Sequence, residues 1–499
     1  MHSQNGTSRV RSSLRLNESN PKTILCFAAL LILFALSSCG GGGGSSSSDA
    51  GSAGVSRGTI TGFGSVIVNG IRFNTGGAEI LFDDNPGPES DLRVGMVVTV
   101  TGRFSGDDRT GTADRITRDE LLKGPVDEIL PPDTIKVLNQ TVHVGTALFE
   151  DFDTPGDPIP GDLMMGTLVE VDGHFDASGD IQATRIEKKI SLLQFKIKGI
   201  IRSTGSDGSF VVGAQTIDFA TAERKNFPAQ GLSPGLFVEV KGDRASPTSV
   251  FIASVVEVEN QGLEGFPGDR VEVEGFVNLI SLPFDTDPGN IDFEVSGQPV
   301  DIVPGTIVEG GSLADIDLND KVEVEGILED RQGELVLVAG EIDLRRANNI
   351  KIAAFVEKTD GVSVTLLGIR VLKDDLTELK DSRDDLRPFT LGDIEEGDYL
   401  EVRGTLDGTD VIASRIERDD PDDIILQGFV TSETPTTMLE ILGVKVHTSG
   451  AQFENENDGP ISAEDFFDRI GVGSLVKAKG SIRPGTENEI DAREVEIEE

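Results

Sequence analysis

The sequence contains no tryptophan, one tyrosine, four histidines and two cysteines among 499 residues. Both cysteines, Cys26 and Cys39, lie near the N-terminus, so the rest of the chain has no disulfide, thiol nucleophile or cysteine metal ligand. The histidines are scattered, whereas a zinc site needs three or four clustered nitrogen or sulfur ligands. These absences exclude disulfide-stapled folds, thiol catalysis and zinc centres of the usual composition.

Positive charge is also scarce. The chain has 44 Lys and Arg residues against 87 Asp and Glu residues, a formal net charge of −43. Such a chain repels phosphate backbones, and it has almost no Trp or Tyr on which bases could stack. We therefore expect no nucleic-acid partner, and we expect the charge to favour solubility.

Residues 1–38 have the pattern of a secretory signal peptide. A basic segment precedes an apolar run from Ile24 to Leu36, which is shorter than the ~20 residues that span a bilayer. The run ends in LSSC (Leu36–Cys39), which resembles the lipobox of bacterial lipoproteins. That resemblance implies cleavage before Cys39 and lipidation of its sulfur. The alternatives are an ordinary signal peptide with an incidental cysteine, or an uncleaved anchor.

A Gly- and Ser-rich tether follows over residues 39–57, of a composition that is typical of flexible linkers. Gly40, rather than aspartate, follows the lipobox cysteine, which resembles the outer-membrane class of Gram-negative lipoproteins. We therefore expect an outer-membrane, lipid-anchored chain that faces the periplasm or the cell surface.

One eleven-residue pattern occurs six times without gaps. It reads Leu or Ile, two residues, Gly or Asn, two residues, Val or Leu, one residue, Val or Ala, one residue, Gly. The copies are Leu92–Gly102, Leu163–Gly173, Leu232–Gly242, Ile316–Gly326, Ile394–Gly404 and Ile470–Gly480. The alternation at the end of each copy predicts a half-buried β-strand. The earlier Gly is Asn319 in the fourth copy, and both residues tolerate left-handed backbone, so we expect a positive φ there.

Each unit contains further matching pieces. A Gly-led opening strand comes first, a hairpin such as SVIVNGIRF (Ser65–Phe73) follows, and a last strand begins with Ala, two residues, then Ile or Val. The opening pairs are Gly62-Phe63, Gly124-Pro125, Gly199-Ile200, Gly275-Phe276, Ala354-Phe355 and Gly428-Phe429. We expect the phenylalanines of these pairs to belong to the core rather than to a ligand-binding face.

These pieces predict an all-β fold of six tandem, small, five-stranded OB-like β-barrel domains, with a short helix or long loop between strands three and four. The segment 463–470 is a candidate for such a helix. The expected repeats are 58–121, 122–190, 195–260, 270–346, 350–419 and 424–499. Short connections between the repeats favour a semi-extended string. An open sandwich or another small barrel is the alternative fold.

The units from Gly58 onward resemble the domain-of-unknown-function repeat numbered 5666 (DUF5666), which occurs in bacterial lipoproteins and secreted proteins. The resemblance rests on the Gly-led opening, the eleven-residue pattern and the Ala-x-x-Ile close. It implies a small β-barrel-type domain in an exported bacterial protein. It transfers no activity and no catalytic residues.

Two kinds of residue are candidates for a site. Acidic loops could offer oxygen ligands to Ca²⁺, with Asp83, Asp84, Asp285 and Asp287 as candidate ligands. The competing interpretation is that these loops are solvated turns, and we expect no other cofactor. His143 and His447 occupy equivalent strands of the second and sixth units, where we expect solvent-facing side chains.

No Gly-x-Ser-x-Gly, P-loop or His-Glu-x-x-His motif is present, and these motifs mark common catalytic sites. We therefore expect a non-enzymatic, lipid-anchored envelope protein that acts as a binding, spacer or assembly module. Besides the membrane, the expected partner is an envelope polysaccharide or another envelope protein. The alternatives are a secreted carbohydrate-active hydrolase with carboxylates in one acidic loop, and a calcium-stiffened surface stalk.

Overall fold

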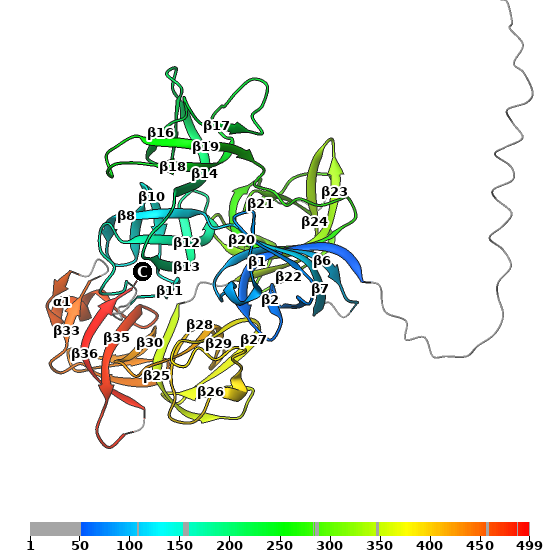
Figure 1. Cartoon of the computed structure of the whole chain (residues 1–499). Helices are drawn as coiled ribbons and strands as arrows, with labels where there is room; N and C mark the ends of the chain where they lie inside the picture. The colour runs from blue at the N-terminus through cyan, green and yellow to red at the C-terminus, as the bar shows by residue number, and fades with distance from the viewer. Residues whose placement is uncertain are drawn as a thin grey trace, which may run out of the picture. The chain divides into compact units, whose positions relative to one another are not determined.

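A computed structural model describes residues 51–499 apart from 107–108, 153–158, 283, 285–288, 346–348, 456–458, 487 and 499. The expected signal peptide, Cys39, Asp285 and Asp287 lie outside the described residues. The structure is nearly all-β (Figure 1). No helix among the described residues is long and apolar enough to cross a membrane.

The first repeat is a small closed barrel of five strands. Strand β1 pairs antiparallel with β2 and β6, β2 with β3, and β6 with β7, while β3 pairs parallel with β7 and closes the circuit. The bounds are β1 (Ser52–Gly62), β2 (Val66–Val68), β3 (Ile71–Asn74), β6 (Val97–Phe104) and β7 (Thr110–Arg118). Strand β1 begins at Ser52, which is six residues before the expected boundary at 58.

The second and third repeats are closed barrels of the same kind within a second sheet. Their strands are β8 (Leu122–Leu130), β9 (Thr134–Val137), β10 (Gln140–His143), β12 (Leu168–Phe175) and β13 (Ile181–Lys189), then β14 (Phe195–Thr204), β15 (Ser209–Val212), β16 (Gln215–Asp218), β18 (Phe237–Asp243) and β19 (Phe251–Glu259). The fourth repeat has the same five pairings and shares the sheet of the first. Its strands are β20 (Arg270–Ile280), β21 (Phe293–Val295), β22 (Gln298–Glu309), β23 (Lys321–Arg331) and β24 (Glu334–Arg345).

The third sheet repeats these pairings twice. Its strands are β25 (Ile350–Thr359), β26 (Ser363–Leu366), β27 (Ile369–Asp381), β28 (Tyr399–Asp407) and β29 (Asp410–Asp419), then β30 (Ile424–Thr434), β31 (Met438–Ile441), β32 (Val444–His447), β35 (Leu475–Ile482) and β36 (Glu489–Ile497).

The connection between the third and fourth strands of a barrel carries the short additional elements. The strands among them are β4 (Glu79–Phe82), β5 (Asn85–Pro86), β11 (Leu148–Glu150), β17 (Glu223–Lys225), β33 (Gln452–Glu454) and β34 (Pro460–Ile461). The 3-10 turns are η1 (Glu89–Asp91), η2 (Leu313–Asp315) and η3 (Leu391–Asp393). Helix α1 (Ala463–Arg469) lies where the sequence predicts a helix, and the Ser462 hydroxyl caps it by accepting a hydrogen bond from the Asp465 amide. Its Phe466 is fully buried and packs on Phe453 with ring centroids 4.9 Å apart.

The repeated eleven-residue pattern folds in the same way in each copy. The twelve apolar positions that alternate near its end are all buried. The Gly or Asn four positions into the pattern has a φ between +72° and +93° in each copy, which confirms the expected left-handed turn. The final Gly of each copy sits at a β-bulge and lies opposite the repeated Ala of the last strand, which in the structure begins before this Ala and not at it. These pairs are Gly102↔Ala113, Gly173↔Ala183, Gly242↔Ala253, Gly326↔Ala339, Gly404↔Ala413 and Gly480↔Ala492.

Two details of the opening strand differ from the sequence prediction. In the first repeat the residue equivalent to Gly124 is Gly58, not Gly62, because Gly58 pairs with Val98 as Gly124 pairs with Val169. The expectation that the phenylalanines after the opening glycines are core residues holds only in part. Phe63 and Phe429 are half-buried and pack against the hydrophobic cores of their sheets, Phe276 is half-buried, and Phe355 is 42% exposed.

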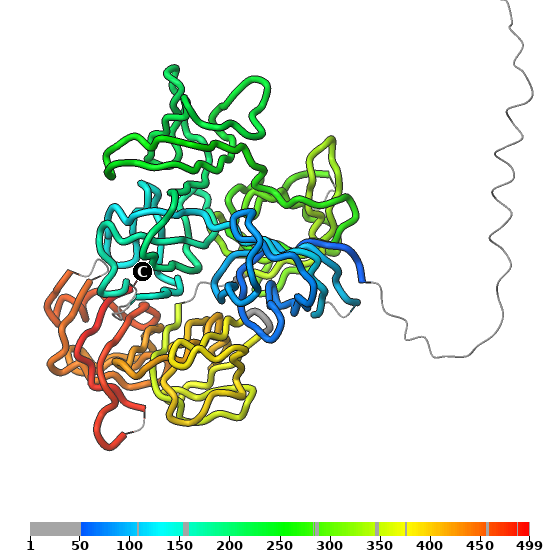
Figure 2. The backbone as a smooth tube through the Cα atoms, viewed as in Figure 1, coloured from blue at the N-terminus to red at the C-terminus, as the bar shows by residue number. Residues whose placement is uncertain are grey.

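The repeats are joined edge to edge rather than strung out in a line. Strand β8 pairs with β14, and β25 pairs with β30, so consecutive repeats share sheets. Strand β1 of the first repeat pairs in parallel with β20 of the fourth over four residues, Gly54↔Arg270 to Arg57↔Val273. Figure 2 shows these two segments, far apart in the sequence, running beside one another. The expected semi-extended string is therefore wrong for these pairs.

Candidate functional site

The outward faces of the barrel strands carry charged residues that become buried where barrels meet. Arg118, at the end of β7 in the first repeat, is 4% exposed. Its guanidinium donates through Nε and Nη2 to the two carboxylate oxygens of Asp172 on β12, at 3.0 and 2.8 Å, and through Nη1 to Glu170 at 3.2 Å. This bidentate pair connects the first and second repeats.

Lys196 on β14 connects the third repeat with the first. Its ammonium lies 3.0 Å from Asp83 of the first repeat and 3.0 Å from Glu239 of its own repeat, and it also contacts Asp119. The side chain is 1% exposed, and Lys198 beside it contacts Asp119 and Glu259. We call Arg118, Asp83, Asp119, Glu120, Glu170, Asp172, Lys196, Lys198 and Glu239 the ionic junction.

The pKa values in the ionic junction shift so that both partners stay charged. Burial alone would lower the pKa of Lys196, but Glu120, Asp119 and Glu239 raise it well above the ordinary value. Burial would likewise raise the pKa of Asp83, and the ammonium groups of Lys196, Lys241 and Lys123 bring it well below the ordinary value instead. Lys196 and Asp83 are therefore both charged at neutral pH.

The structure places two of the calcium candidates. Oxygens of Asp83, Asp119 and Glu239 lie within 4.8 Å of one another, a spacing that could hold a cation. The ammonium groups of Lys196 and Lys241 lie 3.0 and 2.9 Å from the Asp83 carboxylate. They therefore occupy the place that a metal ion would take. Asp84 is exposed.

A second junction surrounds His174, which lies on β12 and is 3% exposed. Its Nε2 lies 3.2 Å from Oε1 of Glu274 on β20, and the Thr59 hydroxyl donates to the same oxygen at 2.6 Å. Lys321 on β23 lies 3.2 Å from that carboxylate. Burial lowers the pKa of His174 despite its bond to Glu274, so a neutral imidazole donates to an ionised Glu274. First, second and fourth repeats meet at this cluster.

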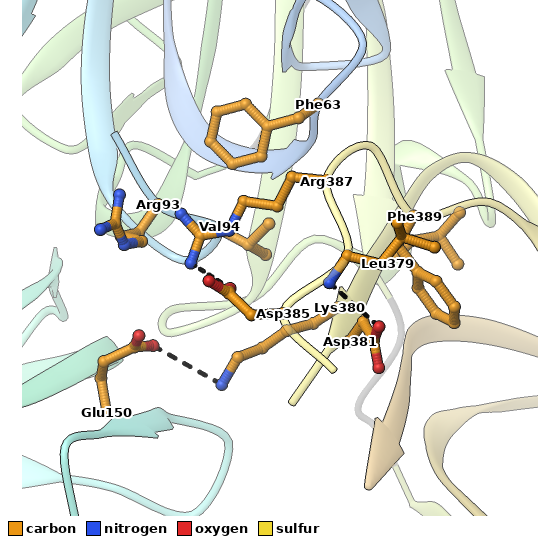
Figure 3. A pocket seen from close by; sticks show the side chains of 11 residues that line it. Phe63, Arg93, Val94, Glu150, Leu379, Lys380, Asp381, Asp385, Arg387 and Phe389 are labelled. Atoms are coloured by element: carbon orange, nitrogen blue, oxygen red, sulfur yellow. Dashed lines mark hydrogen bonds and ion pairs between the residues drawn. The ribbon is translucent and has the colours of Figure 1, made fainter. Parts of the chain in front are cut away.

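A small cavity lies where the first, second and fifth repeats meet. Figure 3 shows Phe63, Arg93 and Val94 of the first repeat facing Lys380 and Arg387 of the fifth. The Lys380 ammonium lies 3.7 Å from the Glu150 carboxylate of the second repeat. The cavity measures about 30 Å³, which is room for about one water.

A larger cavity of about 320 Å³ lies beside the ionic junction, between the first and second repeats. Its walls are mostly polar. Four cationic side chains line it (Arg93, Arg118, Arg185 and Lys189), together with four acidic ones (Asp91, Glu150, Asp151 and Glu187) and the apolar Phe82 and Met96. Arg185 is 1% exposed, and its Nη1 lies 2.7 Å from Glu187. Its Nε has no hydrogen-bond partner among the described residues.

The histidines singled out from the sequence lie away from these junctions. His143 and His447 occupy equivalent positions next to the Gly–Ala bulge, as predicted. His447 Nε2 lies 2.8 Å from Glu489, and His143 Nδ1 lies 3.2 Å from the Thr134 hydroxyl. Both side chains are half-buried rather than fully solvent-facing.

The residues of the junctions were not identified from the sequence. A signal for some of them is visible in hindsight, because Ala-x-Arg-Ile occurs in the last strand of the first, second and fifth repeats, over 113–116, 183–186 and 413–416. Arg185 and Arg415 in two of these copies are buried. Arg415 donates to the Thr146 carbonyl oxygen of another repeat. Arg115 in the first repeat is exposed and pairs with Glu79 of its own repeat, so arginine at this position faces a neighbouring barrel in only two of the three copies.

The model of the domain of unknown function DUF5666 matches residues 57–117, 123–187, 198–257, 289–343 and 354–417. The chain belongs to the DUF5666 family. The five matched segments fall on the first five barrels, and together they cover more than half of the chain. A search of the curated proteins found no match.

Carboxyl groups with a raised pKa occur in several of the DUF5666 repeats. Burial raises the pKa of Glu259, Glu272 and Glu378, which belong to the third, fourth and fifth repeats. A hydrolase site would be expected to concentrate such a group in one repeat. These raised values instead occur in three different repeats.

Proposed function

We propose that this chain is a non-enzymatic, lipid-anchored protein of the bacterial cell envelope, in which six OB-like barrel domains form a binding, spacer or assembly scaffold. The observation that carries the proposal is the use of the charged outer strand faces, such as Arg118, Lys196 and Glu274, to fix one barrel against another. Ion pairs of this kind specify how elements fit together more than they add stability.

The OB-like assignment rests on the order of the strand pairings. In each circuit the first strand pairs with the second and the fourth, and the third strand pairs in parallel with the fifth. The expected boundaries 58–121, 122–190, 195–260, 270–346, 350–419 and 424–499 each contain one such circuit, apart from the earlier start of β1 at Ser52. OB-like barrels commonly bind oligomeric ligands on one face, which supports an envelope polysaccharide or another envelope protein as the partner.

The anchor rests on the lipobox-like LSSC and on the Gly/Ser segment after it. Several acyl chains give stable anchoring where a single chain is marginal. The proposed location is the outer membrane, with the barrels in the periplasm or at the cell surface.

Metabolic labelling with radioactive palmitate tests the anchor. We expect the full chain to take up label and to sediment with membranes, and Cys39→Ser to lose the label. The matched control is Cys26→Ser, which should keep it. Absence of label on the unmodified chain, or label retained in Cys39→Ser, contradicts the proposal.

Protease treatment of intact cells then separates the two orientations. Loss of an epitope in the last repeat, with a periplasmic control protein protected, places the barrels outside and favours ligand capture. Protection until the outer membrane is permeabilised places them in the periplasm and favours a spacer or assembly role.

A further inference from the structure

The cavity of about 320 Å³ between the first and second repeats has the features of a ligand site. At roughly 30 Å³ per water it has room for about ten waters, and therefore for a ligand with about that number of non-hydrogen atoms. That is the size of a single sugar ring. Ligand pockets in proteins begin at about this volume.

Hydrogen-bond donors remain available in the cavity. The buried Arg185 has an Nε without a partner, and its Nη2 lies 4.0 Å from the Glu150 carboxylate, beyond hydrogen-bond distance. Arg93 uses Nη1 on the carbonyl oxygens of Ser90 and Leu92. Two guanidinium groups can therefore donate to a ligand without breaking an ion pair.

Hydrogen-bond acceptors remain available as well. The Glu150 carboxylate lies 3.7 Å from the Lys380 ammonium and 4.0 Å from the Arg185 guanidinium, both beyond hydrogen-bond distance. Asp151 is exposed at the rim. Phe82 and Met96 add an apolar part of the wall.

The charge balance decides the class of ligand. Four cationic and four acidic side chains surround the cavity, so neither an anion nor a cation is favoured overall. A hydroxyl group both donates and accepts, so a neutral molecule rich in hydroxyls can use the guanidinium groups and the carboxylates together. Its C–H groups would meet Phe82 and Met96.

We propose that this cavity binds one neutral sugar unit of an envelope polysaccharide. This inference rests on the proposed function and names the chemistry of the ligand. Of the four places described above where repeats meet, it assigns binding to the larger cavity.

Saturation-transfer difference NMR tests the inference on the full chain purified in detergent micelles. The probes are glucose, galactose, mannose and N-acetylglucosamine, each at millimolar concentration, with glucuronate and inorganic phosphate as anionic probes. We expect saturation of at least one neutral sugar. The result that overturns the inference is saturation of none of the four, or of the anionic probes alone.

Variants locate the binding. Asp151 has a φ of +63°, which Asn also tolerates, so Asp151→Asn removes the charge and leaves the backbone unstrained. We expect it to weaken binding about three- to tenfold, as the loss of one hydrogen bond does. Asp84→Asn is the matched control, because Asp84 is exposed, has the same φ of +63° and lies outside the cavity wall.

Arg93→Gln and Arg185→Met remove the donors, and we expect Arg185→Met to abolish binding. Should Arg185→Met fail to fold, Asp151→Asn and Arg93→Gln still decide the question. Binding unchanged in both overturns the site. The palmitate experiment separates the two proposals, because failed sugar binding with intact labelling rejects only the sugar site.

Discussion

The glycine that ends each eleven-residue pattern is required by close contact rather than by an unusual φ. A Cβ at these positions would lie 2.0–2.4 Å from a carbonyl oxygen of the opposite strand, at the β-bulge. In the sixth repeat that oxygen belongs to Asp491, 2.2 Å from a Cβ at Gly480. Overpacking of this kind costs about 1–3 kcal/mol. We expect Gly480→Ala to lower the local unfolding free energy of β35 and β36 by that amount, measured by amide hydrogen exchange.

Gly471→Ala is the control for this change within the same repeat. A Cβ at Gly471 has no atom within 4 Å, and its φ is not in the left-handed region. Replacing such a glycine reduces the entropy of the unfolded chain, so stability should stay equal or rise slightly. Equal losses in both variants would show that the bulge contact is not what destabilises Gly480→Ala.

His174 makes the stability of its junction depend on pH. Its folded-state pKa is lowered below the ordinary 6.5, chiefly by burial, so the unfolded chain binds the proton more readily. The stability that depends on a neutral His174 is fully present above about pH 6.5. It is lost as the pH falls through the folded-state pKa of His174, by at most about 1.4 kcal/mol per pH unit.

Removing the imidazole tests this pH dependence. The charged groups that face His174 are Glu274, Lys321 and Arg57, and Glu274 titrates at lower pH because its own pKa is held well below 4.5. We expect His174→Gln to flatten the stability profile between pH 7 and 5, measured by chemical denaturation. His447→Gln, at a half-buried histidine away from the barrel junctions, serves as control, and a profile that is unchanged in His174→Gln contradicts the assignment.

At the scale of elements, the sequence predicts what happens inside a barrel and misses what happens between barrels. Period-two alternation and the Gly/Asn turn follow from local rules, so β6 and its counterparts were predictable, as was the helix after Ser462. The opening strand of the first repeat was misaligned by four residues because Gly58 and Gly62 offer two matches to one pattern. The alternation in β12 predicts that its intervening residues Glu170 and Asp172 face solvent, yet both are buried, because burial by another barrel leaves no periodic signal within one strand.

The parallel pairing of β1 with β20 is the element-scale contact most open to test. A Cβ at Gly54 would lie 2.4 Å from both the Arg270 carbonyl oxygen and the Phe104 ring. We expect Gly54→Ala to weaken the pairing and to speed amide exchange at 54–57 and 270–273 by about tenfold or more, equivalent to about 1.4 kcal/mol. Gly62→Ala on the same strand is the control, since its Cβ would first meet Ile67 at 3.4 Å. Unchanged exchange at 270–273 would mean that the two repeats do not rely on this strand pair.

At the scale of the whole molecule, two electrostatic effects oppose one another. The ionic junction holds cations such as Lys196 and Arg118 against carboxylates in buried positions, where salt screens poorly. The 87 acidic residues outnumber the 44 Lys and Arg residues, so 43 negative charges remain unbalanced, and their mutual repulsion disfavours the compact state. Salt therefore screens the repulsion between exposed acidic residues far more than it screens the buried ion pairs.

Added salt should therefore stabilise this protein. We expect the Tm, measured by calorimetry, to rise between low ionic strength and about 0.5 M NaCl, where the Debye length falls well below 10 Å. Choline chloride at the same ionic strength should give the same rise, because screening does not depend on the cation. Lys196→Met should melt at a lower temperature, since it removes the buried one of the two ammonium groups, Lys196 and Lys241, that neutralise Asp83 and Glu239, and it should still gain from salt. A Tm that falls with salt would mean that screenable ion pairs, rather than the excess of acidic residues, set the electrostatic balance.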